Sequence, residues 1–138
     1  MEPITLNAET RDHVLLEWKQ ACDTLLRQVA DWVRQEAHWS AEVYNREITE
    51  EGLGTYHVAS LRIETPQGRL HLEPIARIVF GGTGTVELYA WPTLYRVRLL
   101  RDPEGSAWKV LTDSGIILRQ PWNRDNFIML AEDLLHAE

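Results

Sequence analysis

Three side chains, His57, Glu47 and Tyr95, are the candidates for acid–base chemistry in this sequence. His57 shares the alternating phase of Ala59 and Leu61, which predicts that its ring points inward from a strand. Folding the chain as a hairpin sets Glu47 opposite His57, and an imidazole beside a carboxylate can act as a general base in a cavity. The simpler interpretation is a histidine at the edge of the core, satisfied by one hydrogen bond.

Metal, phosphate and nucleophile chemistry have little support in the sequence. The chain has five histidines and one cysteine, Cys22, and their positions lack the spacing of zinc ligands. The run Gly81-Gly82-Thr83-Gly84 precedes a strand pattern, whereas a phosphate loop precedes a helix, so it predicts a hairpin turn. We therefore predict no catalytic residue, no metal site and no cofactor. This favours a non-enzymatic protein and leaves an enzyme as the alternative.

A second group of side chains has the composition of a binding surface. Strand alternation leaves aromatic, aliphatic and arginine side chains on the face that points away from the core. Aromatic and arginine residues are enriched in binding hot spots, and the plainer interpretation is a solvated face with weak ion pairs. The predicted partner-binding residues are Tyr89, Trp91, Arg96, Arg98, Arg77 and Ile75.

These side chains predict a non-enzymatic protein-interaction module, or an accessory subunit of a cytosolic complex. It would bind another protein, or a second copy of itself, through the outer face of a sheet. The alternative is a small-ligand-binding or enzymatic domain with a pocket between a curved sheet and the N-terminal helix. His57, Glu47 and Tyr95 would line that pocket.

Size and charge limit the classes of protein. A chain of 138 residues is expected to form one domain, residues 1–138. The net charge of −7 argues against a nucleic-acid partner. We expect no membrane span, because the apolar runs are short. One cysteine, and no secretory pattern in the first six residues, predict a cytoplasmic protein.

The elements that must position these residues begin with hairpins. The turn Thr65-Pro66-Gln67-Gly68 sets Leu61 opposite Leu72 and Ile63 opposite Leu70, apolar against apolar. Alternate residues then sort into one apolar face and one charged face. This sorting predicts a half-buried antiparallel sheet.

Three further turns extend the sheet, at residues 81–83, 102–105 and 113–115. The same alternation places Phe80 on the apolar face. The predicted pairs are Ile78 with Val86, Ala76 with Leu88, Pro74 with Ala90, Leu99 with Trp108, Val97 with Val110 and Val110 with Leu118.

The inward phase slips by one residue at Trp91-Pro92-Thr93. Val86 and Leu88 face inward before this point, and Val97 and Leu99 face inward after it. A bulge or corner explains the slip, because proline cannot donate to the strand ladder. We therefore predict that the sheet is strongly bent near Trp91-Pro92.

Apolar residues at spacings of three and four predict two helices. The first runs from about Ala8 to Glu36 after the N-cap Asn7, and the second follows the N-cap Asn123. The apolar sheet face needs a cover, and the helices provide it. The predicted fold is α+β: a long N-terminal helix, a six- or seven-stranded antiparallel meander and a C-terminal helix, with both helices on the concave face.

Overall fold

The structure is a computed structural model that describes residues 7–111, 117–118 and 121–136. Within these residues, one long helix is followed by seven strands and a second helix. The helices are α1 (Ala8–Arg34) and α2 (Arg124–Leu135), and the strands are β1 (Ser40–Glu50), β2 (Gly54–Thr65), β3 (Gly68–Ala76), β4 (Thr85–Trp91), β5 (Arg96–Arg101), β6 (Trp108–Leu111) and β7 (Ile117–Leu118).

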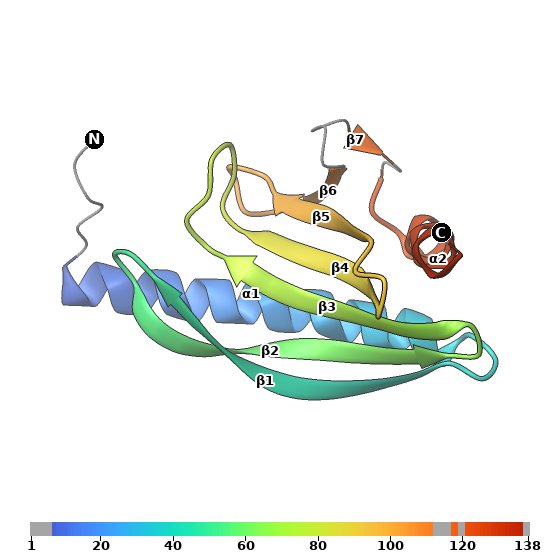
Figure 1. The fold of residues 1–138 in the computed structure, drawn as a ribbon. Helices are drawn as coiled ribbons and strands as arrows, with labels where there is room; N and C mark the ends of the chain where they lie inside the picture. Colours follow the sequence, from blue (N-terminus) through green and yellow to red (C-terminus); the bar gives the residue numbers. More distant parts are fainter. Residues whose placement is uncertain (1–6, 112–116, 119–120, 137–138) are drawn as a thin grey trace.

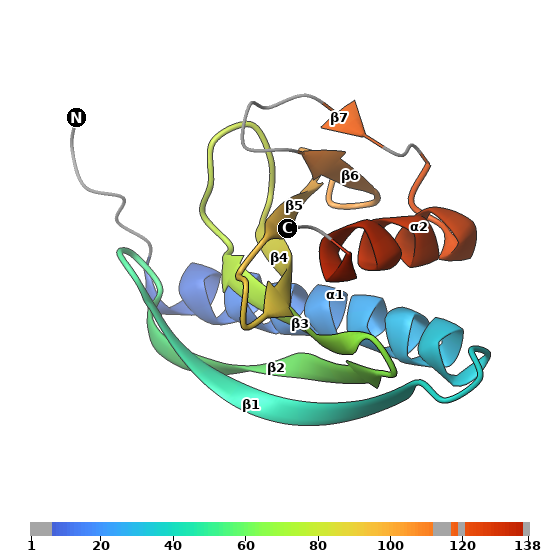
Figure 2. The same cartoon turned by 45° about the vertical axis from the view of Figure 1, so that its right-hand side comes forward.

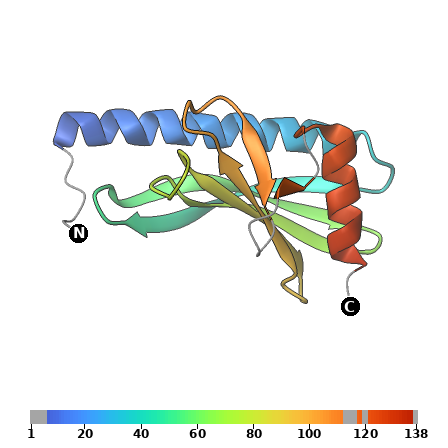
Figure 3. The same ribbon diagram turned by 90° about the horizontal axis from the view of Figure 1, so that it is seen from above.

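The strands form one antiparallel sheet in which each strand pairs with the next along the chain. Both helices lie on the same, concave side of the sheet, and α1 runs alongside β1 and β2 (Figures 1 and 2). Seen from above, α2 lies across the direction of α1, near the C-terminal end of α1 (Figure 3). This arrangement confirms the predicted α+β meander with its two flanking helices.

The two helices begin at the predicted caps. The Asn7 side chain accepts a hydrogen bond from the Thr10 N–H at 2.8 Å, and Asn123 accepts one from the Asn126 N–H at 2.9 Å. Neither described helix is long and apolar enough to cross a membrane. The buried side chains include Trp18, Cys22, Leu25, Val29 and Val33 in α1, and Phe127, Leu130 and Leu134 in α2.

The strand registers are partly as predicted. Leu61 pairs with Leu72, as expected. The predicted register of β3 with β4 is wrong by four residues, because Val86 pairs with Pro74 instead of Ile78. The register of β5 with β6 is wrong by two. Both errors are even, so the strand residues concerned keep the predicted face. The pairs of the last strands are Leu99 with Val110, Arg101 with Trp108 and Val110 with Leu118; the predicted turn at 113–115 lies outside the described residues.

A loop of residues 77–84 joins β3 to β4, where the sequence predicts a three-residue turn. The Glu50 carboxylate accepts hydrogen bonds from the N–H groups of Arg77 and Ile78, each at 3.0 Å. The predicted strand ladder would need these same N–H groups as donors, so it does not extend to these residues. Phe80, predicted on the apolar face, is instead 97% exposed in this loop.

The change of direction at Trp91-Pro92 is a reversal of the chain between β4 and β5, instead of a bulge or corner in one bent strand. The Leu94 N–H donates to the Ala90 carbonyl, and the Ala90 N–H donates to the Tyr95 carbonyl, both at 2.9 Å. The peptide bond between Trp91 and Pro92 is cis. The reversal explains the slip of phase. Tyr95, predicted to face inward, is 41% exposed in this turn.

A buried arginine joins α1 to β5. Arg101 is 2% exposed, and its guanidinium donates to the two carboxylate oxygens of Glu17 at 2.7 and 2.8 Å. It also donates to the Thr83 carbonyl at 2.9 Å and lies 5.3 Å from the centroid of the Trp18 ring. These contacts replace the water that a charged guanidinium loses on burial. The hydrogen bonds from Arg101 lower the pKa of the Glu17 carboxyl.

Gly84 lies where this junction has no space for a side chain. Its φ is +142°, and an added Cβ would lie 2.2 Å from the Trp18 ring. We predict that Gly84→Ala lowers the free energy of unfolding by about 3 kcal/mol or more, because the overlap and the backbone strain add. Gly81→Ala, at φ +78° in open space, should cost only about 1 kcal/mol. Urea unfolding followed by tryptophan fluorescence compares the two, and equal losses would contradict the packing argument.

Candidate functional site

The sheet has a second face, on the side opposite the helices, which we call the outer face. His71 in β3 pairs with Tyr89 in β4, and Tyr89 pairs with Arg96 in β5, so the three side chains share this face. Four partly buried side chains form its centre, here named the outer-face cluster: Tyr44, His71, Glu73 and Tyr89.

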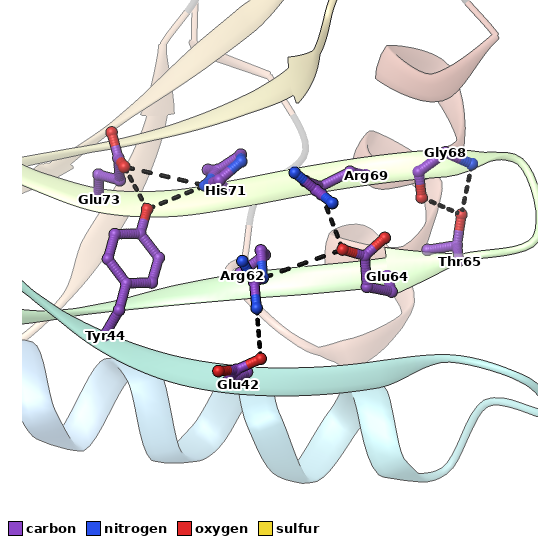
Figure 4. Close-up of polar contacts among 9 residues, drawn as sticks. All are labelled: Glu42, Tyr44, Arg62, Glu64, Thr65, Gly68, Arg69, His71 and Glu73. Atoms are coloured by element: carbon purple, nitrogen blue, oxygen red, sulfur yellow. Dashed lines mark hydrogen bonds and ion pairs between the residues drawn. The ribbon is translucent and has the colours of Figure 1, made fainter.

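Tyr44 of β1 reaches across β2 to two residues of β3 (Figure 4). Its hydroxyl donates to the Glu73 carboxylate and lies 2.9 Å from Nδ1 of His71. Because a phenol has one hydrogen, Nδ1 of His71 must be the donor to Tyr44, which leaves Nε2 of the neutral ring with a lone pair. Arg46 supports the same carboxylate at 3.7 Å and donates to the Pro74 carbonyl at 2.7 Å.

The cluster is held in one protonation state near neutral pH. The rings of His71 and Tyr89 stack, with centroids 4.9 Å apart and planes inclined by 10°. Burial lowers the pKa of the His71 imidazole. Burial, followed by the negative charge of Glu73, raises the pKa of Tyr89 to about 12, and burial with the hydrogen bond to Glu73 raises the pKa of Tyr44. The imidazole and both phenols are therefore neutral at pH 7.

Ion pairs continue the outer face toward the turn between β2 and β3 (Figure 4). Arg62 pairs with Glu42 and lies 3.9 Å from Glu64. Arg69 lies 2.7 Å from the same Glu64 carboxylate and pairs across the ladder with Trp91, which is 53% exposed. Because exposed ion pairs contribute little individually, these pairs mainly orient the side chains.

A hollow of about 250 Å³ opens beside the outer-face cluster. Two apolar side chains, Ile75 and Leu94, are exposed there. The Arg96 side chain is 47% exposed and lies 3.9 Å from Glu87, whereas the side chains of Glu87 and Glu73 are only 15% and 12% exposed. The hollow therefore presents mainly positive charge to solvent. Its lining residues are Arg46, Glu73, Ile75, Glu87, Tyr89, Leu94 and Arg96.

Five of the six predicted partner-binding residues occupy the outer face. Ile75, Tyr89 and Arg96 line the hollow. Trp91 and Arg98 are exposed on the same face, and Arg98 pairs across the ladder with a residue of the hollow, Glu87. The structure thus brings three of these residues together and places two beside them.

Arg77 is the sixth, and its predicted place on this face is wrong. It belongs to the loop after β3, where its N–H donates to Glu50. Burial lowers the pKa of Arg77, as does the nearby charge of Arg101, while Glu17 opposes this effect. These influences place its guanidinium near the buried Arg101 junction. The cause is the path of the loop, which leaves the sheet before residue 77.

The sequence reasoning missed Tyr44 and Arg46, and gave Glu73 and Glu87 no specific role. Alternation alone places these side chains on the outer face. It gives no distance between β1 and β3, which β2 separates. Ser60 of β2 pairs with Tyr44 of β1. The short side chain of Ser60 allows the Tyr44 ring to pass over β2.

A second hollow, of about 420 Å³, lies between α1 and the first two strands; we call it the α1–β1 groove. Leu26 and Ala30 on its helix side are buried, and Val43 on its strand side is 59% exposed. Charged residues of α1 form its outer lip. Its lining residues are Asp23, Leu26, Arg27, Ala30, Asp31, Arg34, Val43 and Ala59.

The residues predicted to line a pocket here lie elsewhere. His57 and Glu47 pair across β1 and β2, as expected, but both are exposed. The inward orientation predicted for His57 is wrong, because the first half of β2 buries its other side through Tyr56 and Val58. Tyr95 lies in the turn between β4 and β5. The three side chains therefore do not form one polar lining.

The chemistry open to the outer face is hydrogen bonding and ion pairing. Within residues 7–111, 117–118 and 121–136, no three His, Cys, Asp or Glu side chains are grouped so that they could hold a metal ion. Cys22 is fully buried, and burial raises the pKa of its thiol, which keeps the thiol protonated. Arg96 can bind a carboxylate beside the apolar Ile75 and Leu94.

No protein-family model matches the chain, and neither a curated protein nor a solved structure matches it significantly. Its function is therefore inferred from the geometry of the chain itself.

The lowered pKa of His71 predicts a loss of stability in mild acid. When the pH falls below the usual value of 6.5, the unfolded chain binds a proton that the folded ring resists, so the free energy of unfolding decreases. We expect His71→Gln to reduce this decrease between pH 7 and pH 5 and to leave the pH dependence above pH 8 unchanged. Urea midpoints measured across this range test it. Parallel curves for the two proteins would contradict the role of His71.

Proposed function

We propose that this chain is a non-enzymatic protein-interaction module, or an accessory subunit of a cytoplasmic complex, that binds another protein through the outer face of its sheet. The observation that carries the proposal is the hollow beside the outer-face cluster. There, exposed Ile75 and Leu94 lie beside the Arg96 guanidinium and the Tyr89 ring. Aromatic and arginine side chains around an apolar depression are typical of binding hot spots.

The positive charges beside the hollow favour a partner segment that carries a carboxylate next to a bulky apolar side chain. Arg96 and Arg98 alternate on β5, so their side chains leave the same face about 7 Å apart. Guanidinium groups bind carboxylates through paired hydrogen bonds. The nearby acidic side chains, Glu73 and Glu87, each lie within 3.9 Å of an arginine, Arg46 and Arg96, whose positive charge offsets their repulsion of an approaching carboxylate. The apolar side chain of the partner would enter the hollow.

The outer-face cluster supports the proposal because it orders one wall of the hollow in advance. The stack of His71 on Tyr89 and the hydrogen bonds of Tyr44 restrict these side chains before a partner arrives. A surface that is ordered in advance loses less conformational entropy on binding.

We expect the double substitution Trp91→Ala, Arg96→Ala to weaken binding of the partner at least about tenfold, because buried tryptophan and arginine contacts dominate interfaces. The matched control is Leu16→Ala, Arg11→Ala, which removes an exposed apolar side chain and an exposed arginine from α1. Tagged proteins would be used to capture partners from the native host, and mass spectrometry would identify them.

A partner retained by the wild type and the control, and lost by the double variant, supports the proposal. Circular dichroism must show that all three proteins are equally folded. A partner that binds the double variant as tightly as the wild type would contradict the outer face as the binding surface.

A further inference from the structure

β1 has one free edge. Each residue from Ser40 to Glu50 pairs with β2 on one side, and no described strand pairs with the other side. A free edge of 11 residues is a template for pairing with a further strand. Val43 is exposed beside this edge and opens onto the α1–β1 groove. The edge and the groove therefore form one surface that offers both backbone hydrogen bonds and apolar contact.

The charged lip of the groove is complementary to a reversed copy of itself. Its residues alternate in sign at spacings of three and four, so they lie along one side of α1. When a second copy of the helix runs antiparallel to the first, Arg27 of the first chain lies opposite Asp31 of the second. By symmetry, Asp31 of the first chain lies opposite Arg27 of the second. The charged residues of the lip are Asp23, Arg27, Asp31 and Arg34.

These charged side chains can still form ion pairs with a second chain. Arg27 pairs with Asp23 and Arg34 pairs with Asp31 within α1, each at 3.0 Å. All four side chains remain between 49% and 80% exposed. Their outer donors and acceptors therefore still face solvent. Exposed pairs of this kind contribute little alone, so the row acts mainly by selecting the orientation of a partner.

β1 contains the same kind of symmetry. Glu42 and Arg46 lie two residues on either side of Tyr44. Antiparallel pairing of two β1 strands with Tyr44 at the centre sets Glu42 of each chain opposite Arg46 of the other. Val43, which lines the same groove as the charged lip, then lies opposite Asn45 of the second copy. The self-complementary strand and the self-complementary charged row thus border the same groove.

From this coincidence we propose that a second copy of the chain pairs with the β1 edge and closes the α1–β1 groove. The two-fold axis passes midway between the two Tyr44 residues, perpendicular to the sheet. The two sheets become one continuous sheet, and the two α1 helices run antiparallel on the same side of it. Stable dimers bury roughly 1,200–2,000 Å² in total, so the helix contacts are needed in addition to the strands.

The dimer and the proposed function use mainly different residues: the dimer uses the β1 edge and the α1–β1 groove, and Arg46 is the residue that also lines the hollow. A two-fold axis perpendicular to the sheet leaves both outer faces on the same side of the dimer, each with its hollow uncovered. Two linked sites bind a partner with repeated segments more tightly than one site does. Loss of the dimer would therefore leave binding of a single segment intact.

Sedimentation equilibrium of the full chain is expected to give twice the mass of the chain. Arg27→Asp should raise the dimer dissociation constant at least about tenfold, since it sets like charges against each other at two symmetric positions. Adding Asp31→Arg to that variant restores opposite charges and should restore the dimer. The matched control Arg11→Asp changes an exposed arginine of α1 outside the groove and should leave the mass unchanged.

The register is tested by Tyr44→Cys, which places two cysteines opposite each other across the axis, at the separation that a disulfide requires. Mild oxidation should link this variant into a dimer, whereas Glu50→Cys, at the end of the strand, should stay unlinked. Cys22, the native cysteine, is buried in the structure. Circular dichroism shows whether each variant is folded. A monomeric wild type, including one whose groove takes a small ligand or another protein, overturns the proposal, as does a dimer that is unaffected by Arg27→Asp.

Discussion

Covering one face of the sheet with α1 and α2 is the constraint on which the other features depend. Leu61, Leu72, Leu88 and Leu99 come from four successive strands, and all are fully buried beneath the helices. Each buried leucine contributes about 1.5–3 kcal/mol relative to exposure. A shift of one residue in β2 or β3 would exchange a buried leucine for a polar neighbour. The cover therefore determines which side chains remain on the outer face.

The Arg101 junction adds a polar constraint at one end of this apolar layer. Its guanidinium bridges Glu17 of α1 and the Thr83 carbonyl of the loop that follows β3. Gly84 then packs directly against Trp18. The junction and the Glu50 hydrogen bonds define the path of the loop, which explains why Arg77 leaves the outer face while Ile75 stays on it.

The two proposed surfaces differ in how their polar groups are satisfied. On the outer face, hydrogen bonds and ion pairs already join neighbouring strands, and the exposed guanidinium groups of Arg96 and Arg98 are what a partner would meet. At the β1 edge, the available groups belong to the backbone, and side-chain charges only select the orientation. The outer face would recognise particular side chains of a partner. The β1 edge would recognise a strand with a complementary pattern of charges, and β1 of a second copy is such a strand.

The spacing of apolar residues, the capping asparagines and the turns are local signals. They were therefore sufficient to predict the helices, the two caps, the antiparallel order and the face occupied by Tyr89, Trp91, Arg96 and Arg98. The register of β3 with β4 was beyond these signals, since an even shift leaves every face unchanged and the loop length depends on Glu50, far away in the chain. The exposure of His57 and the contact of Tyr44 with Glu73 were also decided in three dimensions. The exposure of His57 depends on how the long β1–β2 hairpin twists against α1. The contact of Tyr44 depends on its side chain passing over β2. Both result from packing between segments that are distant in the sequence.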